Sequence, residues 1–333
     1  MKAKKKEKIV YNSFNIEIDR PKAILLGNGV IYNVESKWEK IIDKLAKNEV
    51  KKEKIEAPYS LMATIITDSD DRKRQEKYLN YFTDNNDKGE KYKYFKYELI
   101  DELLKLPFNA ILTTNYTYEI ENALVANFSI LEPRKQSKFA CFQNPSQNSK
   151  FPKDSRYLLR TFNRLYSKAI GQRDIWHIHG EVRRKTSMVL THDEYARLIG
   201  EILKYNKARA DDYEKKADNL EFKSWIDYFI MADLYIVGQS FDFSEFDLWW
   251  LLNRRIRERG KIGKVVFYEP VKKDNSHKLN ALDAMGVECK TLDIVINDET
   301  ENYKYQEFYQ KVIKDIQFEE LNELDREKEY CEA

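Results

Sequence analysis

The sequence predicts an α/β protein with a mostly parallel sheet, helices on both of its faces and helical insertions. Short apolar runs of strand length alternate with segments whose apolar residues recur at helical spacing. Strands that are separated by helices favour a parallel sheet with both faces covered. Several of these runs end at a glycine or an asparagine, and open α/β sheets bind ligands at the carboxyl ends of their strands. We therefore expect a ligand site at that edge of the sheet.

Each predicted element corresponds to its own stretch of sequence. The apolar runs predicted as strands are 22–27, 108–113, 176–180, 233–238, 264–268 and 287–292. The segments predicted as helices are 33–48, much of 58–106, the residues around 120, 156–169, two within 194–231, a short one before 287, and the tail from 303. A polar stretch with three prolines, 127–153, is predicted as a long surface loop or insertion. We divide the chain into an extension (1–20), one domain (21–298) and a helical tail (299–333).

Composition narrows the class of protein. The chain has 333 residues, 42% of them hydrophobic, which is enough for a sizeable core and excludes a disordered or fibrous protein. Its 58 basic and 56 acidic residues give a net charge of +2, and this balance argues against nucleic acid as the main ligand. Its three cysteines form no Cys-x-x-Cys pair, and no run has the length of a membrane helix. We expect a soluble, reduced, cytoplasmic protein.

The first candidate motif is Gly27-Asn28-Gly29, which follows one predicted strand and precedes a helix. Glycines at such a position let the backbone approach a phosphate, and the helix N-terminus supplies N–H donors. The motif lacks the third glycine of the dinucleotide fingerprint, so an ordinary strand–helix turn is the alternative.

The second candidate is Asn115, directly beyond the second predicted strand. A neutral amide can bind a ribose hydroxyl or orient a water without adding charge beside a cationic intermediate. The alternative is helix capping, because Thr114 and Asn115 are both good N-cap residues.

The third candidate contains two of the four histidines of the chain, in Trp176-His177-Ile178-His179-Gly180. A histidine at a strand end is a natural general base, because it titrates near neutrality. His179 adjoins the glycine at which the chain must turn, so we expect it to face the cleft. His177 is predicted to lie one layer deeper as a packing or hydrogen-bonding partner. A metal site is the less favoured alternative, because the other two histidines show no companion pattern.

The fourth candidate is Gly238-Gln239-Ser240, which closes another predicted strand. Ser240 could donate to a phosphate or a ribose. The acids that follow, Asp242, Glu245 and Asp247, are interpreted as the favourable acidic first turn of the next helix.

Taken in order, these four motifs resemble the Rossmann-like NAD-binding fold of the sirtuins. The sequence motifs Leu-Leu-Gly-Asn-Gly, Thr-Thr-Asn-Tyr and Trp-His-Ile-His-Gly resemble those of the divergent sirtuin-like domains of bacterial anti-phage defence proteins. Those proteins are associated with NAD⁺ depletion. The resemblance implies contacts of Gly27, Asn28, Gly29 and Thr114 with the dinucleotide, with the two glycines at the pyrophosphate. It implies that Asn115 contacts the nicotinamide ribose and that His179 is the catalytic base. Gly238 and Ser240 would hold the adenosine half.

The resemblance implies an NAD⁺ glycohydrolase that releases nicotinamide and ADP-ribose as the toxic effector of an abortive-infection system. NAD⁺ would be the substrate, and no metal is expected. A protein deacylase or ADP-ribosyltransferase on the same fold is the first alternative, although sirtuin deacylases usually carry a zinc module with paired cysteines. A sensor that binds NAD⁺ or ADP-ribose without turnover is the second.

Control is expected through partners, because a hydrolase that drains NAD⁺ must be silent before infection. We expect self-association or a separately encoded defence partner, such as a nucleotide-sensing enzyme, an ATPase or an argonaute-like protein. The candidate surfaces are the insertion 127–153 and the charged C-terminal helix. No direct contact with nucleic acid or membrane is expected.

Overall fold

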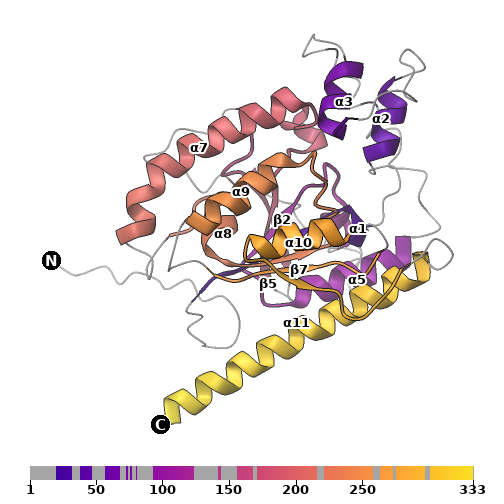
Figure 1. Cartoon of the computed structure of the whole chain (residues 1–333). Coiled ribbons are helices and arrows are strands. Elements are labelled where there is room, and N and C mark those ends of the chain that lie inside the picture. Colours follow the sequence, from indigo (N-terminus) through magenta and orange to yellow (C-terminus); the bar gives the residue numbers. More distant parts are fainter. Residues whose placement is uncertain are drawn as a thin grey trace, which may run out of the picture.

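An α/β sandwich forms the body of the chain (Figure 1). The computed structural model describes residues 20–31, 38–46, 57–67, 93–123, 142–143, 156–167, 171–215, 221–257, 263–272, 275–296 and 301–332, with single residues 73, 76 and 80. The strands within these ranges are β1 (Lys22–Leu26), β2 (Ala110–Thr113), β3 (Phe142–Gln143), β4 (Phe162–Ser167), β5 (Gly171–His177), β6 (Asp233–Val237), β7 (Val265–Tyr268) and β8 (Glu288–Lys290).

These strands form one sheet in the order β3-β4-β5-β2-β1-β6-β7-β8. The six strands from β5 to β8 are mutually parallel, whereas β4 pairs antiparallel with β5 and β3 antiparallel with β4. This confirms the mostly parallel sheet. Because β5, β2, β1, β6 and β7 run in the same direction, their carboxyl ends meet at one edge of the sheet.

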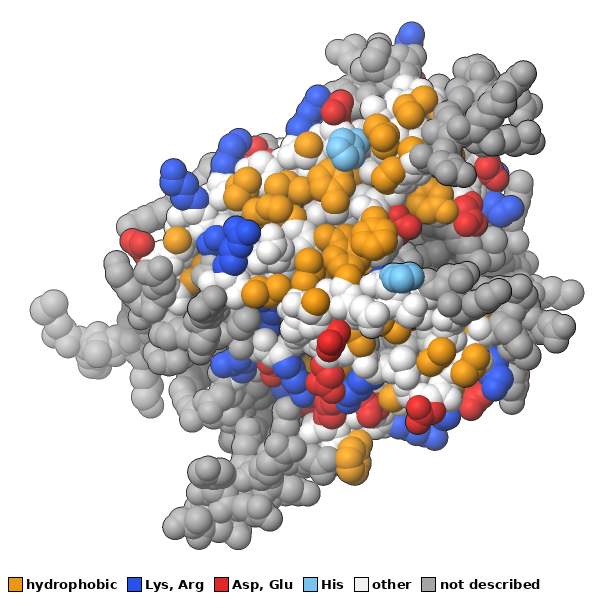
Figure 2. Space-filling model, viewed as in Figure 1, with side chains coloured by type: hydrophobic (Ala, Val, Ile, Leu, Met, Phe, Trp, Pro, Cys, Tyr) orange, Lys and Arg blue, Asp and Glu red, His pale blue; other side chains and the backbone are white. Residues whose placement is uncertain are grey.

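Helices cover both faces of the sheet. They are α1 (Asn28–Ile31), α2 (Trp38–Ala46), α3 (Tyr59–Ile66), α5 (Lys93–Lys105), α7 (His192–Lys215), α8 (Trp225–Met231), α9 (Phe246–Arg257), α10 (Ser276–Ala284) and α11 (Glu301–Glu332), and a further helix begins at Glu119. Figure 1 shows α7 to α10 on one side of the sheet and α5 with α11 on the other. Figure 2 shows hydrophobic side chains gathered near the centre of the visible face. Among the large hydrophobic residues of the described ranges, Leu203 of α7 is 49% exposed and Phe243 is 65% exposed.

Alternation along the central strands divides the core into two layers. In β1, Ala23 and Leu25 join the layer beneath α7 to α10, and Ile24 and Leu26 join the layer against α5 and α11. All four side chains are fully buried, as expected for a strand that is covered on both faces. A third, smaller cluster packs α2 and α3 against the loop after β2, above the carboxyl edge of the sheet.

One predicted helix is wrong. The segment 156–169 contains strand β4, which forms an antiparallel pair with β5. An ion pair and a ring contact stabilise the two strands: Arg164 makes two 2.7 Å contacts with the carboxylate of Asp174, and the ring centroids of Phe162 and Trp176 lie 4.7 Å apart. The spacing of apolar residues fitted a helix locally, but pairing with a strand further along the chain decides the structure.

Other boundaries differ from the predictions by several residues. Strand β5 begins at Gly171 rather than 176, and His177 is its last residue, so His179 lies in the following turn. The predicted helix 33–48 corresponds to α2, and the chain is already helical at Asn28–Ile31 in α1. The predicted extension 1–20 and the predicted loop 127–153 lie outside the described residues, apart from residue 20 and strand β3.

Candidate functional site

A cavity of about 420 Å³ opens at the carboxyl edge of the sheet. Five parallel strands lead into its wall, and the lining residues that follow them are Asn28 and Gly29 after β1, Thr114, Asn115 and Tyr116 after β2, His179 after β5, Gly238, Gln239 and Ser240 after β6, and Glu269 after β7. Trp38 of α2 and Tyr59 of α3 add an aromatic rim, with their rings stacked at 5.8 Å. A volume of this size suits a small-molecule ligand or cofactor.

His179 lies at the floor of this cavity and is 1% exposed. The turn after it requires Gly180, whose φ is +88°, because an added Cβ would lie 2.3 Å from the carbonyl oxygen of Ser187. The Nε2 atom of His179 lies 2.9 Å from Oδ2 of Asp247, which is fully buried in the first turn of α9. The other oxygen of Asp247, Oδ1, has no hydrogen-bond partner among the residues that the structure describes.

The pairing with Asp247 decides the chemistry of His179. Burial alone would lower the pKa of His179, but the charge and hydrogen bond of Asp247, together with the charge of Glu245, raise it by more, and the net pKa is above 6.5. Because Asp247 accepts the Nε2 hydrogen, Nδ1 is the nitrogen that remains to take up a proton in the neutral imidazole. This arrangement is the base-and-orienter pair found in general-base catalysis.

A second acid, Glu245, lines the same floor. Burial raises the pKa of Glu245 to about 7, against the opposing effect of the nearby His179. Its carboxyl group is hydrogen-bonded to the side-chain amide of Gln239, and the Oε1 of Gln239 accepts a 3.1 Å hydrogen bond from the hydroxyl of Thr114. This chain of contacts ties the loop after β2 to the loop after β6.

Asn115 lines the cavity and is 6% exposed. Its Nδ2 donates to the Thr113 hydroxyl at 2.9 Å, and that hydroxyl donates to the carbonyl oxygen of Leu26 at 2.8 Å. The next helix begins at Glu119, so Asn115 lies too far upstream to be its N-cap. The capping alternative therefore does not hold.

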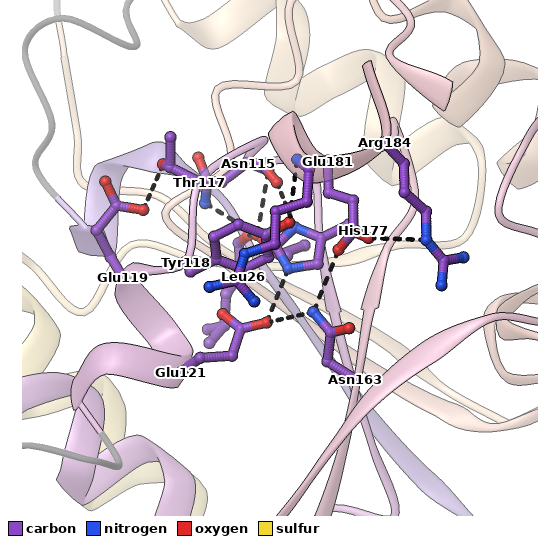
Figure 3. Close-up of polar contacts among 12 residues, drawn as sticks. Leu26, Asn115, Thr117, Tyr118, Glu119, Glu121, Asn163, His177, Glu181 and Arg184 are labelled. Carbon is purple, nitrogen blue, oxygen red and sulfur yellow. Dashed lines mark hydrogen bonds and ion pairs between the residues drawn. The ribbon is translucent and has the colours of Figure 1, made fainter. Parts of the chain in front are cut away.

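His177 belongs to a separate buried network behind Asn115 (Figure 3). Its Nδ1 lies 2.6 Å from the backbone oxygen of Asn115, and its Nε2 lies 2.9 Å from Oε1 of Glu121. Asn163 donates to both Glu121 and Glu181 at 2.9 and 3.2 Å. His177 does not line the cavity. It fixes the backbone from which the cavity side chain of Asn115 projects.

The glycines at the ends of β1 and β6 pack backbone against backbone. Gly27 N donates to Val237 O at 3.0 Å, and Gly29 N donates to Gly238 O at 2.7 Å. A Cβ on Gly27 would lie 2.4 Å from the backbone oxygen of Gly238, whose own φ is +70°. Asn28, Gly29 and Gly238 line the cavity, whereas Gly27 is not among its lining residues. The N–H of Gly29 is already hydrogen-bonded to the backbone of Gly238. Close packing between the ends of β1 and β6 therefore accounts for a glycine at this position without a bound ligand.

Sequence reasoning missed three side chains of the site: Gln239 and Glu245, which line the cavity, and Asp247, which contacts His179 from outside the lining. The acids were interpreted only as the first turn of a helix, and Asp247 does occupy that turn. Their signal was their position directly after a Gly-x-Ser strand end, the point where side chains turn toward the cavity. Ser240 is exposed at the cavity mouth, and its backbone oxygen accepts a 2.7 Å hydrogen bond from Lys278.

No group of three or more His, Cys, Asp or Glu side chains in the described ranges is placed to hold a metal ion. Within the same ranges, the helices are too short or too polar to span a membrane.

The chain matches the sequence model of one protein family. A sequence model of the SIR2-like domain matches residues 109–289, which is more than half of the 333 residues. The match runs from the residue before β2 to the middle of β8, and so includes Asn115, His179 and Asp247. It leaves out β1 with its glycine turn and α11. No curated protein matches the chain.

Proposed function

The chain belongs to the family of SIR2-like domains, and from that premise we propose that it is an NAD⁺ hydrolase that releases nicotinamide and ADP-ribose. The observation that carries the proposal is the buried His179–Asp247 pair at 2.9 Å on the floor of a cavity that Asn115 also lines. NAD⁺ use accords with the family, and the reaction is our inference from the groups on the cavity floor.

Cleavage breaks the bond between the anomeric carbon of the ribose and the nicotinamide nitrogen. The bonding electrons leave with the nitrogen, which converts the cationic ring to neutral nicotinamide, so no strong general acid is needed. Positive charge develops at the anomeric carbon in the transition state. The carboxyl group of Glu245, which lines the cavity, favours that charge when it is ionised, and the buried Asp247 behind His179 adds to the effect.

Water then supplies the oxygen of the new bond to the anomeric carbon. In our proposal Nδ1 of His179 takes the proton of this water, and Asp247 stabilises the imidazolium that forms. Asn115 holds the ribose or the water, with its side chain oriented by Thr113. Asn28, Gly29 and Thr114 contact the dinucleotide at the centre of the cavity, and Gly238 and Ser240 contact its adenosine half. Gly27 does not line the cavity, and in our proposal it shapes the turn after β1.

The test is a product analysis with the purified full chain. Incubation with NAD⁺ should give free nicotinamide and ADP-ribose in equal amounts without any acceptor, as resolved by chromatography. Turnover that requires an acyl-lysine peptide would replace the hydrolase with a deacylase. Binding of NAD⁺ without turnover under any activating condition would favour a sensor.

We propose a setting of anti-phage defence for this activity, in which NAD⁺ depletion arrests the infected cell. Support comes from the resemblance of the strand-end motifs to defence-associated sirtuin-like domains and from the family match. Such a toxin must be restrained, so we propose control by self-association or by a separately encoded defence partner in the cytoplasm. Comparing phage plating on cells that carry the wild type or His179→Ala tests this setting.

A further inference from the structure

The cavity extends beyond the catalytic floor toward the C-terminal helix. His179 follows β5 and Glu269 follows β7, four strand intervals apart in the sheet. Adjacent strands are spaced by about 4.8 Å, so the two residues follow strands that lie about 19 Å apart across the sheet. That span suits an elongated ligand whose reacting end lies at β5 and β2 and whose other end lies at β7.

Helix α11 supplies the wall at the β7 end through Tyr305 and Tyr309, which both line the cavity. Their rings are stacked with centroids 6.0 Å apart. Tyr309 is 4% exposed, and a Cβ on Gly29 would lie 2.5 Å from its hydroxyl oxygen. Tyr309 therefore reaches the glycine turn of β1, although Gly29 lies 280 positions earlier in the sequence.

Two charged residues after β7 complete this end of the cavity. Lys272 Nζ lies 3.5 Å from Oε1 of Glu269 and 5.1 Å from the centre of the Tyr305 ring. A carboxylate and an ammonium group can accept from and donate to the hydroxyls of a ribose. The partly buried ring of Tyr305 offers an aromatic face suited to a purine base, and the buried ring of Tyr309 stacks on it.

The position of α11 is fixed by packing and by ion pairs. Phe308, Val312 and Ile316 are fully buried in the core layer that lies between the sheet and α5 with α11. Further along the helix, Lys290 of β8 contacts Asp315 at 2.7 Å, and Lys264 contacts Glu319 at 2.8 Å. These contacts hold the helix on the side of the sheet that also carries α5 (Figure 1). Its tyrosines are thereby presented to the cavity as fixed groups.

We infer that helix α11 is part of the dinucleotide site, with Tyr305 and Tyr309 forming the wall that receives the adenosine half. This inference rests on the proposed function, because it assumes that the ligand is NAD⁺. It extends the site to a helix outside the part of the chain that matches the family. Occupation of the cavity and docking of α11 are then linked, since a ligand that contacts both tyrosines stabilises the docked helix.

Calorimetric titration of the full chain with ADP-ribose and with AMP tests the inference. Both probes carry the adenosine half, and neither can be cleaved at a nicotinamide bond. Tyr305→Ala and Tyr309→Ala should each raise the Kd of both probes by about tenfold, a typical loss when one aromatic contact to a base is removed. Phe318→Ala, on the same helix but 64% exposed, is the matched control and should leave both Kd values unchanged.

The outcomes separate this inference from the proposed function. A wild type that binds neither probe nor NAD⁺ would overturn both. A wild type that binds, with unchanged Kd values in the tyrosine variants, would overturn the role of α11 alone, as would weaker ADP-ribose binding with unchanged AMP binding. Tyr305 is only partly buried, so Tyr305→Ala keeps the test decisive if Tyr309→Ala does not fold. Amide exchange across residues 304–313 should also slow when ADP-ribose binds.

Discussion

Single substitutions at His179 and Asn115 should remove catalysis while the protein remains folded. His179→Ala removes the proposed base and should lower nicotinamide release by about 10²–10⁴-fold, the usual contribution of general-base catalysis. Asn115→Ala should lower it to a similar degree, because a misplaced ribose or water loses its reactive geometry. ADP-ribose should still bind to both variants. If His179→Ala retained turnover while His177→Ala abolished it in a folded protein, the base would be His177.

Asp247 should set the pH at which the reaction proceeds. The base must be unprotonated, and its carboxylate partner holds the pKa of His179 above 6.5. Nicotinamide release should therefore rise with pH on the alkaline side of 6.5. Asp247→Asn removes the charge that favours the imidazolium, so the rising limb should move to lower pH while the maximum rate falls. If the rising limb of the pH–rate profile stays at the same pH in Asp247→Asn, then Asp247 does not set the pKa of His179.

Single residues also mark the limit of sequence reasoning. The Gly-x-Gly, Thr-x-Asn, His-Gly and Gly-x-Ser strand ends were visible because each motif is local. Asp247 could not be assigned to His179, because the contact joins residues 68 positions apart and depends on how α9 lies over the sheet. Glu121 and His177 are separated by 56 positions in the same way.

At the scale of elements, the His177–Glu121 pair joins strand β5 to the helix that begins at Glu119. Burial lowers the pKa of His177, but Glu121, with contributions from Glu181 and the Asn115 backbone, outweighs burial and raises the pKa to about 9; His177 correspondingly lowers the pKa of Glu121. An unfolded histidine titrates near 6.5. The stabilisation from His177 is thus fully present below pH 6.5 and is lost as pH rises through about 9. The stabilisation from Glu121 is present above its ordinary pKa and is lost in acid.

Denaturant unfolding of the wild type and His177→Gln tests this element. The difference in free energy of unfolding should be largest near pH 6 and should shrink steadily toward pH 9 and above. Glu181→Gln is the graded comparison, since the Glu181 charge also raises the pKa of His177 without contacting its ring and should therefore give a smaller change with the same pH dependence. A difference that is constant from pH 6 to 9 would mean that His177 is neutral in the folded protein.

Elements differ in how far their sequence determines them. The buried runs of β1, β2, β6 and β7 were predicted to within a few residues, because a strand covered on both faces is a short, continuous apolar run. Strand β4 was not, because its apolar residues also fit a helical repeat. This segment is a strand because it pairs with β5, and the spacing of apolar residues along the sequence carries no information about that tertiary contact.

At the scale of the whole molecule, every group that we assign to catalysis comes from one copy of the chain. His179, Asp247 and Asn115 are already in contact or share one cavity wall in the single chain. Restraint of the proposed activity must then act on access to the cavity or on the fine geometry of its loops. Assembly can do either, and it would make the rate per chain depend on protein concentration.

We therefore expect specific NAD⁺ hydrolysis to rise with protein concentration, or to appear only when the defence partner is added. The rate per chain is to be measured over a dilution series, with mass determined by light scattering at each concentration. His179→Ala serves as the blank for contaminating hydrolases. Because assembly shifts a population rather than creating the site, activity and the assembled fraction should increase together. Full activity from a dilute, purified monomer would refute control by assembly and leave the hydrolase constitutive.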